Sequence, residues 1–504
     1  MRATHSGLRK QRLPLAAAIA ASIAAPASFA RADEYAAGQV QVLLLPGVSI
    51  ETINARYGTT TLKALHPLYL LDVPANVTED DVLLDMDDDP EIDESEYAWE
   101  NETPEGTRQM VVAAIGGTIA GYLDQSVTTR LHLDEAHQHT TGEGVIVAII
   151  DSGVALNHPA LAGALLSNGY DFVDNDSDPT DVANGTDDDL DGDTDEGAGH
   201  GTMIAGIVHL VAPGAKILPI RVLDDEGRGD TFTVAEGIRW AVDHGATVIN
   251  LSLGLDSKVL AMEHEIMMAD AAGITVVGAA GNADAQDILY PAREDGCLSV
   301  AAVDSLDIKA TFSNHHSDVD LSAPGDGIYA PYHDGAYAVG AGTSFAAPFV
   351  SGQAALIRSL NPGLSGYQVR HTVRQGVVPV DALPGNLPYQ GQLGTGRFDA
   401  LVTFQQTPVA ADVIPPLFAT TPLRVVPNPS SIGTVVAFER PTEEASAITI
   451  LDASGRIVRR LEASTSTWDG LDEAGRGVAA GIYFARTADG SGRTAGGTVV
   501  RIAR

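Results

Sequence analysis

The stretch VIVAIIDSGV, residues 145–154, decides the fold of this chain. Six consecutive apolar residues lead into an aspartate, a serine and a glycine, which is typical of a strand that is buried on both faces and ends in a turn. Such strands occur almost only in parallel sheets that helices cover on both sides. The stretch therefore predicts a strand of an α/β sheet with Asp151 at its carboxyl end.

Similar apolar runs alternate with helical patterns from Gly144 to about Thr403. The further strands are AKILPIRVL (215–223), ATVINLSLG (246–254) and GITVVGAAGN (273–282). The helices are MIAGIVHLV (203–211), TFTVAEGIRWAVDHG (231–245) and AMEHEIMMADAAG (261–273). This alternation predicts an α/β domain with a doubly wound, mostly parallel sheet.

The charge of the chain limits its partners. There are 67 Asp and Glu residues against 30 Lys and Arg, a net charge of −37. This balance argues against nucleic acid and anionic membranes as partners and favours cations. The only cysteine, Cys297, has no partner in the chain for a disulfide, so core packing or bound metal has to supply the stability.

The ends of the chain have a different organisation from the α/β domain. Residues 1–30 combine a basic start, a short apolar run and small residues at a cleavage position, which is typical of a secretory signal peptide. The only other apolar run of note, Met110 to Gly121, is too short to span a bilayer. We therefore expect an exported, soluble mature protein without a transmembrane segment.

Five segments follow from these patterns: a signal peptide (1–30), a small α+β unit with an acidic linker (31–121), the α/β domain (122–408), a Pro-rich linker (409–423), and an antiparallel β-sandwich of Ig-like type (424–504). The acidic linker rests on fourteen Asp and Glu residues between Glu79 and Glu105, which suggest a solvated face or a connection.

Polar residues of a hydrolytic site follow the predicted strands. Asp151 and Asn282 end two of them, His200 begins an apolar helix in GHGTMIAGI, and Ser344 begins another in GTSFAAP. Each has a plain alternative, because aspartate and asparagine are common in turns and serine at helix starts. An active serine needs a base, an orienting carboxylate and oxyanion donors, and the four residues together would supply them at the carboxyl edge of the sheet.

At these positions the chain resembles the subtilase family of serine proteases. The matching motifs are AIIDSGV, GHGTMIAG, NLSLG, AAGN, LSAPG and GTSFAAP, over about 260 residues and in the order Asp, His, Ser. The resemblance implies that Ser344 is the nucleophile, His200 the general base and acid, and Asp151 the residue that orients the imidazole. It also implies that the Asn282 amide and the Ser344 backbone N–H bind the oxyanion.

The resemblance also places the substrate. An extended peptide is expected to add as a strand to Ser252, Leu253 and Gly254, and the pocket for its primary side chain would be lined by Gly254, Ala279, Ala280 and Gly281. These small residues suggest room for a large apolar side chain. The chain departs from the family at Met203 and Phe345, where we expect altered packing and intact catalysis.

The interval from Asp151 to His200 contains an acidic insertion, FVDNDSDPTDVANGTDDDLDGDTDEG. Asp187, Asp189, Asp191, Asp193 and Asp195 alternate so that their oxygens could bind a structural Ca²⁺ ion. An EF-hand is excluded because Ala198 stands where its twelfth residue, a glutamate, is needed. A merely solvated acidic loop is the alternative.

The flanking segments complete the expected function. The unit after the signal peptide resembles the inhibitory prodomain of secreted subtilases, which implies a self-processed zymogen. The C-terminal segment resembles the Ig-like domain of flagellar hook-capping protein, which implies a sorting, surface-attachment or stabilising role. We thus expect a monomeric, secreted or cell-surface serine endopeptidase that acts on polypeptides. Against the alternatives, a binding scaffold would not need the four site residues, and a sedolisin-like enzyme would need a glutamate in place of His200.

Overall fold

The computed structural model describes residues 35–102, 113–114, 117–188, 192 and 194–407, and parts of 424–502. The parts described after residue 407 are 424–426, 430–431, 435–439, 448–451, 457–462, 465–472, 475–478, 481–488 and 494–502. The predicted signal peptide and the linker at 409–423 lie outside these residues.

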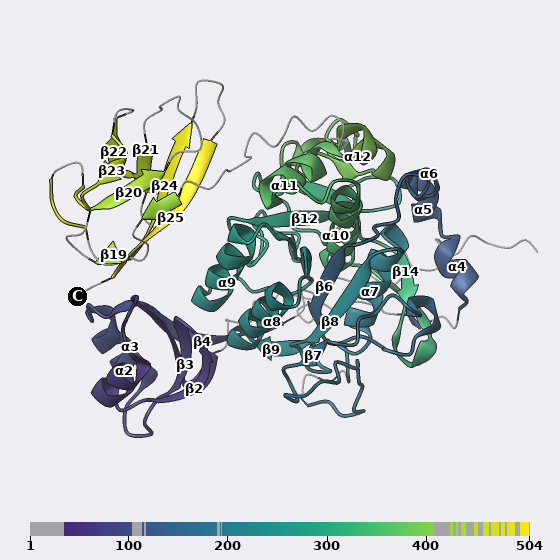
Figure 1. Cartoon of the computed structure of the whole chain (residues 1–504). Helices are drawn as coiled ribbons and strands as arrows, with labels where there is room; N and C mark the ends of the chain where they lie inside the picture. Colours follow the sequence, from purple (N-terminus) through teal and green to yellow (C-terminus); the bar gives the residue numbers. More distant parts are fainter. Residues whose placement is uncertain are drawn as a thin grey trace, which may run out of the picture. The chain divides into compact units, whose positions relative to one another are not determined.

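A nine-stranded sheet forms the centre of the α/β domain, in the order β16-β17-β13-β12-β11-β10-β6-β8-β7. Four of its strands, β12, β6, β8 and β7, are labelled in Figure 1. Its bounds are β6 (Ile146–Asp151), β7 (Tyr170–Asp171), β8 (Lys216–Arg221), β10 (Val248–Leu251), β11 (Thr275–Ala279), β12 (Cys297–Val303), β13 (Leu321–Pro324), β16 (Val377–Val378) and β17 (Arg397–Phe398). All neighbours pair in parallel except β16 and β17. The predicted mostly parallel sheet is confirmed.

Strand β6 shows why helices cover both faces of the sheet. Val147 and Ile149 of β6 point into one buried cluster, while Ala148 and Ile150 point into another. The first cluster contains side chains of α5 (Ser126–Arg130), α6 (Leu133–Ala136), α7 (His200–Val211), α10 (Thr343–Leu360), α11 (Gly366–Gln375) and α12 (Ala400–Gln406). The second contains side chains of α8 (Thr231–Asp243) and α9 (Leu260–Ala271). Alternating side chains thus bury both faces of the sheet.

The α/β domain also contains several short elements. They are β5 (Ala113–Ala114), α4 (Ile119–Leu123), β9 (Arg228–Asp230), β14 (Ile328–Pro331) and β15 (Tyr337–Gly340), with single 3₁₀ turns at Pro159–Leu161, His333–Gly335 and Leu387–Tyr389. Among the helices of the described parts of the chain, none is both long and apolar enough to cross a membrane.

The N-terminal described part is an antiparallel sheet in the order β2-β3-β1-β4, with two helices. Its elements are β1 (Tyr35–Leu44), α2 (Ile50–Tyr57), β2 (Thr60–Leu65), β3 (Leu68–Asp72), α3 (Glu79–Asp87) and β4 (Ile92–Glu102). Val40, Val42 and Leu71 of the sheet pack against Ile53 of α2 and Met86 of α3.

Most of the acidic stretch from Glu79, for which the sequence left a solvated face or a connection open, forms α3 and β4. Thr78 caps α3 by accepting a hydrogen bond from the Asp81 N–H at 3.2 Å. The acidic first turn of α3, Glu79 to Asp81, lies at the positive end of the helix dipole, where negative charge is stabilising. Val82 and Met86 provide the buried side of the helix.

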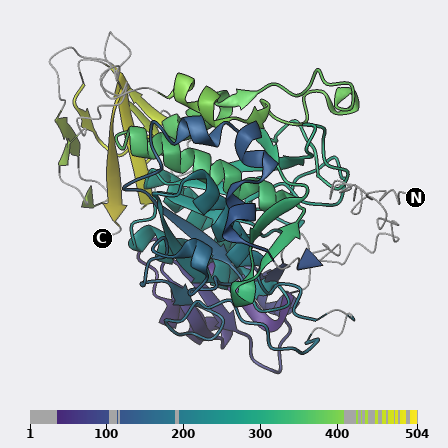
Figure 2. The ribbon, with the colours of Figure 1, turned by 90° about the vertical axis from the view of Figure 1, so that its right-hand side faces the viewer.

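The C-terminal described parts form two sheets, in the orders β18-β20-β23 and β19-β25-β24-β21-β22 (olive and yellow arrows at the left of Figure 2). The strands are β18 (Arg424–Val426), β19 (Ser430–Ser431), β20 (Val436–Glu439), β21 (Ile448–Leu451), β22 (Ile457–Leu461), β23 (Thr467–Trp468), β24 (Gly481–Ala488) and β25 (Thr494–Ile502). Trp468 of the first sheet and Tyr483 of the second belong to one buried cluster, with ring centroids 5.3 Å apart. The Ig-like assignment of this segment stays a prediction.

Candidate active site

Asp151 and His200 form a buried pair at the carboxyl edge of the sheet. Asp151 is the last residue of β6 and is 0% exposed; His200 is the first residue of α7 and is 6% exposed. The imidazole Nδ1 lies 2.7 Å from Asp151 Oδ1, which also accepts a hydrogen bond from the Ser152 N–H at 2.8 Å. A buried carboxylate in contact with Nδ1 fixes the orientation of the imidazole and stabilises its protonated form.

Gly201 permits the close approach of α7 to the end of β6. A Cβ atom at this position would lie 2.1 Å from the Gly153 carbonyl oxygen and 3.0 Å from Asp151 Oδ1. A side chain would therefore push the helix away from the strand and break the contact between Asp151 and His200. This packing explains why the residue after His200 in the GHG motif is a glycine.

Asp181 also holds the start of α7, and the sequence analysis missed this residue. Its Oδ1 accepts a hydrogen bond from Gly199 N–H at 2.9 Å and its Oδ2 one from the Thr202 hydroxyl at 2.6 Å. Burial raises the pKa of Asp181 to about 6. Among the many acidic residues of the insertion, the sequence offered no sign that one is buried.

Ser344 is the second residue of α10 and is fully buried. Its Oγ lies 3.4 Å from the Ser252 carbonyl oxygen, and its own carbonyl oxygen accepts a hydrogen bond from Ser252 Oγ at 2.9 Å. Asn250 Nδ2 donates to Ser252 Oγ, and Asn250 Oδ1 accepts from Ser351 of α10. This network of buried polar groups fixes the start of α10 to the end of β10.

Asn282 lies beside the start of α10. Its Oδ1 accepts hydrogen bonds from the Thr343 N–H at 2.8 Å and from Thr343 Oγ1 at 2.9 Å, and Thr343 Oγ1 in turn accepts one from Gly281 N–H. With Oδ1 held in this way, the amide directs Nδ2 away from Thr343. Thr343 thus orients the side chain of Asn282, a role that the sequence analysis did not assign.

Phe345 links the serine and the histidine. Its ring meets the imidazole of His200 edge-on, with centroids 5.7 Å apart. Both Phe345 and Met203, the two departures from the family pattern, are fully buried, as expected. The structure therefore brings Asp151, His200, Asn282 and Ser344 to one edge of the sheet, at the starts of α7 and α10.

The six residues predicted to contact the substrate also lie at this edge. Ser252, Leu253, Gly254, Ala279, Ala280 and Gly281 follow or end β10 and β11, and all are buried. Gly254 and Gly281 both border the side chain of Leu289, which the sequence analysis did not consider.

The structure also shows a pairing at the edge of β9 that the sequence analysis did not predict. Strand β9 pairs antiparallel with the end of β4, in the register Glu100 with Asp230, Asn101 with Gly229 and Glu102 with Arg228. An extended segment of the chain is therefore held by backbone hydrogen bonds against β9.

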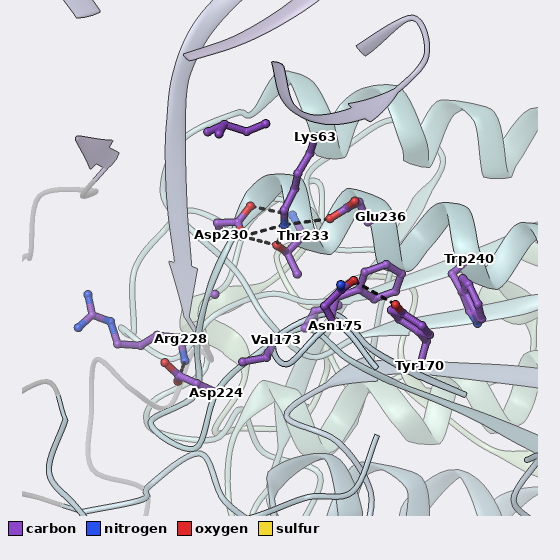
Figure 3. Close-up of a pocket in the computed structure, with 14 residues that line it drawn as sticks. Lys63, Tyr170, Val173, Asn175, Asp224, Arg228, Asp230, Thr233, Glu236 and Trp240 are labelled. Atoms are coloured by element: carbon purple, nitrogen blue, oxygen red, sulfur yellow. Dashed lines mark hydrogen bonds and ion pairs between the residues drawn. The ribbon is translucent and has the colours of Figure 1, made fainter. Parts of the chain in front are cut away.

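Beside this edge lies a cavity of about 710 Å³, which is distinct from the Asp151–His200 pair (Figure 3). Lys63 reaches across it from β2 to Glu236 at 2.9 Å and to the Thr233 hydroxyl at 2.6 Å, both on α8. Tyr170 and Trp240 stand on the opposite side, with ring centroids 4.6 Å apart. The contacts of Lys63 connect the N-terminal sheet to the α/β domain.

The acidic insertion is described only in part. Asp189, Asp191 and Asp193 lie outside the described residues, and among the residues that are described no group of three or more His, Cys, Asp or Glu could hold a metal ion. Both oxygens of Asp195 accept backbone hydrogen bonds from Gly185. Within the described parts, Asp187 Oδ1 and Glu226 Oε2 are buried carboxylate oxygens without a hydrogen-bond partner. These two oxygens suit a hard cation.

An α/β sheet with an Asp–His pair and a helix-start serine at its carboxyl edge is the arrangement of a serine-type hydrolase. The model of the subtilase family matches residues 142–394. Thermitase of Thermoactinomyces vulgaris is 39% identical over 286 residues, which are 55% of this chain and 94% of thermitase. Subtilisin BL of Lederbergia lenta is 35% identical, over 49% of this chain and 88% of that protein.

A solved structure extends the likeness in fold. Fervidolysin from Fervidobacterium pennivorans, described as a keratinolytic enzyme related to subtilisin, has a TM-score of 0.61, with 20% identity, over 94% of this chain and 79% of its own. At this identity the likeness shows the fold alone. The chain belongs to the subtilase family, and it is a serine-type endopeptidase.

Proposed function

We propose that this chain is a secreted endopeptidase that uses Asp151, His200 and Ser344 as a catalytic triad and is made as a self-processed zymogen. The observation that supports the triad most is the 2.7 Å contact between Asp151 and His200, beside the start of α10 that carries Ser344. His200 removes the proton from Ser344 Oγ as the oxygen attacks the scissile carbonyl, and later gives it to the leaving amine. Asp151 keeps the imidazole in the required tautomer.

Asn282 and the Ser344 N–H stabilise the oxyanion in this proposal. Thr343 holds Asn282 Oδ1 by two hydrogen bonds, so the Nδ2 donor is oriented before the substrate arrives. The Ser344 N–H lies in the first turn of α10, where backbone donors are not used by the helix itself. Preorganised donors of this kind cost little to align in the transition state.

The substrate binds as an extended chain between two edges. Ser252 to Gly254 form one of them, and β9 forms the other. The pairing of β4 with β9 supports this placement, because it is the backbone arrangement that an extended peptide would adopt there.

The N-terminal unit acts as the prodomain and intramolecular inhibitor. Leu68 and Leu70 of β3 and Ala98 of β4 pack against Phe232 of α8 and Leu260 of α9. This apolar contact and the pairing of β4 with β9 support the assignment. Self-cleavage after β4 would release the unit, and the C-terminal sheets would serve sorting, surface attachment or stabilisation.

A structural Ca²⁺ ion belongs to the same proposal. Asp187 and Glu226, each with a buried oxygen that has no hydrogen-bond partner among the described residues, would hold it together with Asp189, Asp191 and Asp193. The oxygens of Asp195, which the sequence analysis included, accept backbone hydrogen bonds from Asn184 and Gly185 instead. Bound Ca²⁺ would neutralise part of the acidic insertion and stabilise it. Polypeptides are the substrates in this proposal, and the high negative charge favours cations over nucleic acid as further partners.

The proposal is tested with Ser344→Ala and, as a matched control, Ser317→Ala at an exposed serine of the same domain. After incubation with a fluorophosphonate, intact mass should show one adduct on a shortened wild type and control, and an unlabelled full-length Ser344→Ala chain. Turnover of the variant should fall by about 10⁶. Processing of purified Ser344→Ala would contradict self-cleavage, and labelling of Ser344→Ala would contradict the nucleophile.

A further inference from the structure

Three backbone segments meet where the primary specificity pocket is proposed. They are the segment after β10, the segment after β11 and the segment around Leu289. Leu255 and Tyr290 exchange two backbone hydrogen bonds of 2.9 Å each, and Leu289 N–H donates to the Ala280 carbonyl at 3.1 Å. The backbone of Leu289 is therefore held on both sides.

This placement directs the leucine side chain between the two glycines. A Cβ atom at Gly254 would lie 3.0 Å from both Cβ and Cδ1 of Leu289. A Cβ atom at Gly281 would lie 2.8 Å from Cγ and 3.0 Å from Cδ1 of the same residue. One methyl group of Leu289 thus borders both glycines, which are far apart in the sequence but face each other here.

The space that the glycines leave open is therefore occupied by a side chain from a third segment. We propose that Leu289 fills the primary specificity pocket and restricts the substrate residue that provides the scissile carbonyl, here called the acyl-side residue, to small side chains. This inference rests on the proposed function and on the pocket predicted from the sequence, in which the acyl-side residue lies between Gly254 and Gly281. It reverses the expectation from the small residues alone.

The physical reason is steric. A large acyl-side ring could enter only if Leu289 moved, but hydrogen bonds on both sides hold its backbone, and Ile288 beside it is anchored in a buried cluster with Ala280, Ala301 and Val319. Excess volume in a well-packed site is destabilising. A difference of a single methylene in a pocket already changes kcat/KM by about 10- to 200-fold.

The test compares two peptide p-nitroanilides that differ only in an acyl-side alanine or phenylalanine, with active sites counted by fluorophosphonate titration. We expect wild type to have a kcat/KM at least about 10-fold higher for alanine than for phenylalanine. Leu289→Ala, which removes Cγ and both methyl groups, should lower this ratio by about 10-fold or more by gaining activity on phenylalanine. Leu306→Ala, the same substitution at an exposed leucine of the α/β domain, should leave the ratio as in wild type.

Wild type that prefers phenylalanine would overturn the inference, even if Leu289→Ala fails to fold. An unchanged ratio in a titratable Leu289→Ala enzyme would also overturn it. Failure of the proposed function has a different signature, because wild type would then neither take the fluorophosphonate nor hydrolyse either peptide.

Discussion

Asp181 shows how one residue can support the proposed catalytic pair of Asp151 and His200 without belonging to it. The carboxylate accepts hydrogen bonds from the Gly199 backbone and from Thr202, so both ends of the first turn of α7 depend on it. Thr202 Oγ1 also accepts a hydrogen bond from the Ala155 N–H, in the loop after β6. Asp181 is thereby a positioning residue for His200 and Asp151.

The raised pKa of Asp181 makes stability depend on pH. The folded chain holds this proton up to about pH 6, whereas the unfolded chain loses it near pH 3.8. Between these values the folded state binds more protons, so this residue's contribution to the free energy of unfolding falls as pH rises, by about 3 kcal/mol in total.

Asp181→Asn, in a Ser344→Ala background that prevents self-digestion, should remove this fall. Chemical denaturation at pH 4 and pH 7 would measure it, with the exposed Asp243→Asn as a matched control. The stability of the Asp181 variant relative to wild type should rise from pH 4 to pH 7, while that of the control stays constant. Equal pH dependence of wild type and Asp181→Asn would contradict the assignment.

Sequence reasoning could predict the placement of residues with a distinctive local pattern and missed the contacts of residues defined by distant neighbours. The topology alone brings together four residues that lie at the end of a strand or in the first turn of a helix: Asp151, His200, Asn282 and Ser344. Leu289 is not one of them, because its importance depends on glycines from two other segments. Thr343 belongs to the same group, since its role depends on Asn282 across the sheet edge.

At the scale of elements, two acidic stretches of similar composition fold differently. The stretch from Glu79 contains Val82 and Met86 at helical spacing, so it forms α3 against a buried sheet. The insertion between β7 and α7 has no comparable apolar face, and the described part of it runs as a loop. Apolar spacing, not charge, would have separated the two cases.

If Ca²⁺ binds the insertion, chelation should lower the Tm of the Ser344→Ala protein by several degrees. Binding at a free Ca²⁺ concentration 100-fold above Kd stabilises by about 2.7 kcal/mol. Glu226→Gln keeps the acceptor for Asp188 N–H but removes one charged ligand, so it should reduce the shift. Asp243→Asn removes one negative charge outside the insertion, so this variant should keep the full Tm shift on chelation. If chelation leaves the Tm of the Ser344→Ala protein unchanged, a structural Ca²⁺ ion is excluded.

At the scale of the whole molecule, the N-terminal sheet supplies the side-chain cap that the first turn of α9 does not have from its own segment. The residue before α9, Val259, cannot cap the helix with its side chain. Glu96 of β4 takes this role by accepting a hydrogen bond from the Leu260 N–H at 2.7 Å. Burial, with Glu94 and Glu263 nearby, raises the pKa of this partly buried carboxyl to about 8.

Docking of the N-terminal unit should therefore weaken as pH rises towards 8. The docked state holds the Glu96 proton more tightly than the undocked state, where the pKa of the carboxyl is near 4.5. One such group can weaken the docking equilibrium by at most about tenfold for each pH unit. Hydrogen exchange at β4 and the start of α9 in the full-length Ser344→Ala chain would measure it.

The matched variant is Glu96→Gln, which keeps the acceptor but cannot ionise. At each pH its protection at the start of α9 should be compared with that of the parent. Protection in the parent should decline relative to Glu96→Gln between about pH 6 and 8. Parallel profiles for the two proteins would show that Glu96 does not set the pH dependence.

The pairing of β4 with β9 has a consequence for the protein before it acts. An open strand edge offers rows of backbone donors and acceptors to any extended chain, including a second copy of the same molecule. In the intact chain the edge of β9 that faces β4 is already taken by residues 100–102. Molecules of the intact chain can therefore come close together without joining at this edge, so residues 100–102 also protect it against aggregation.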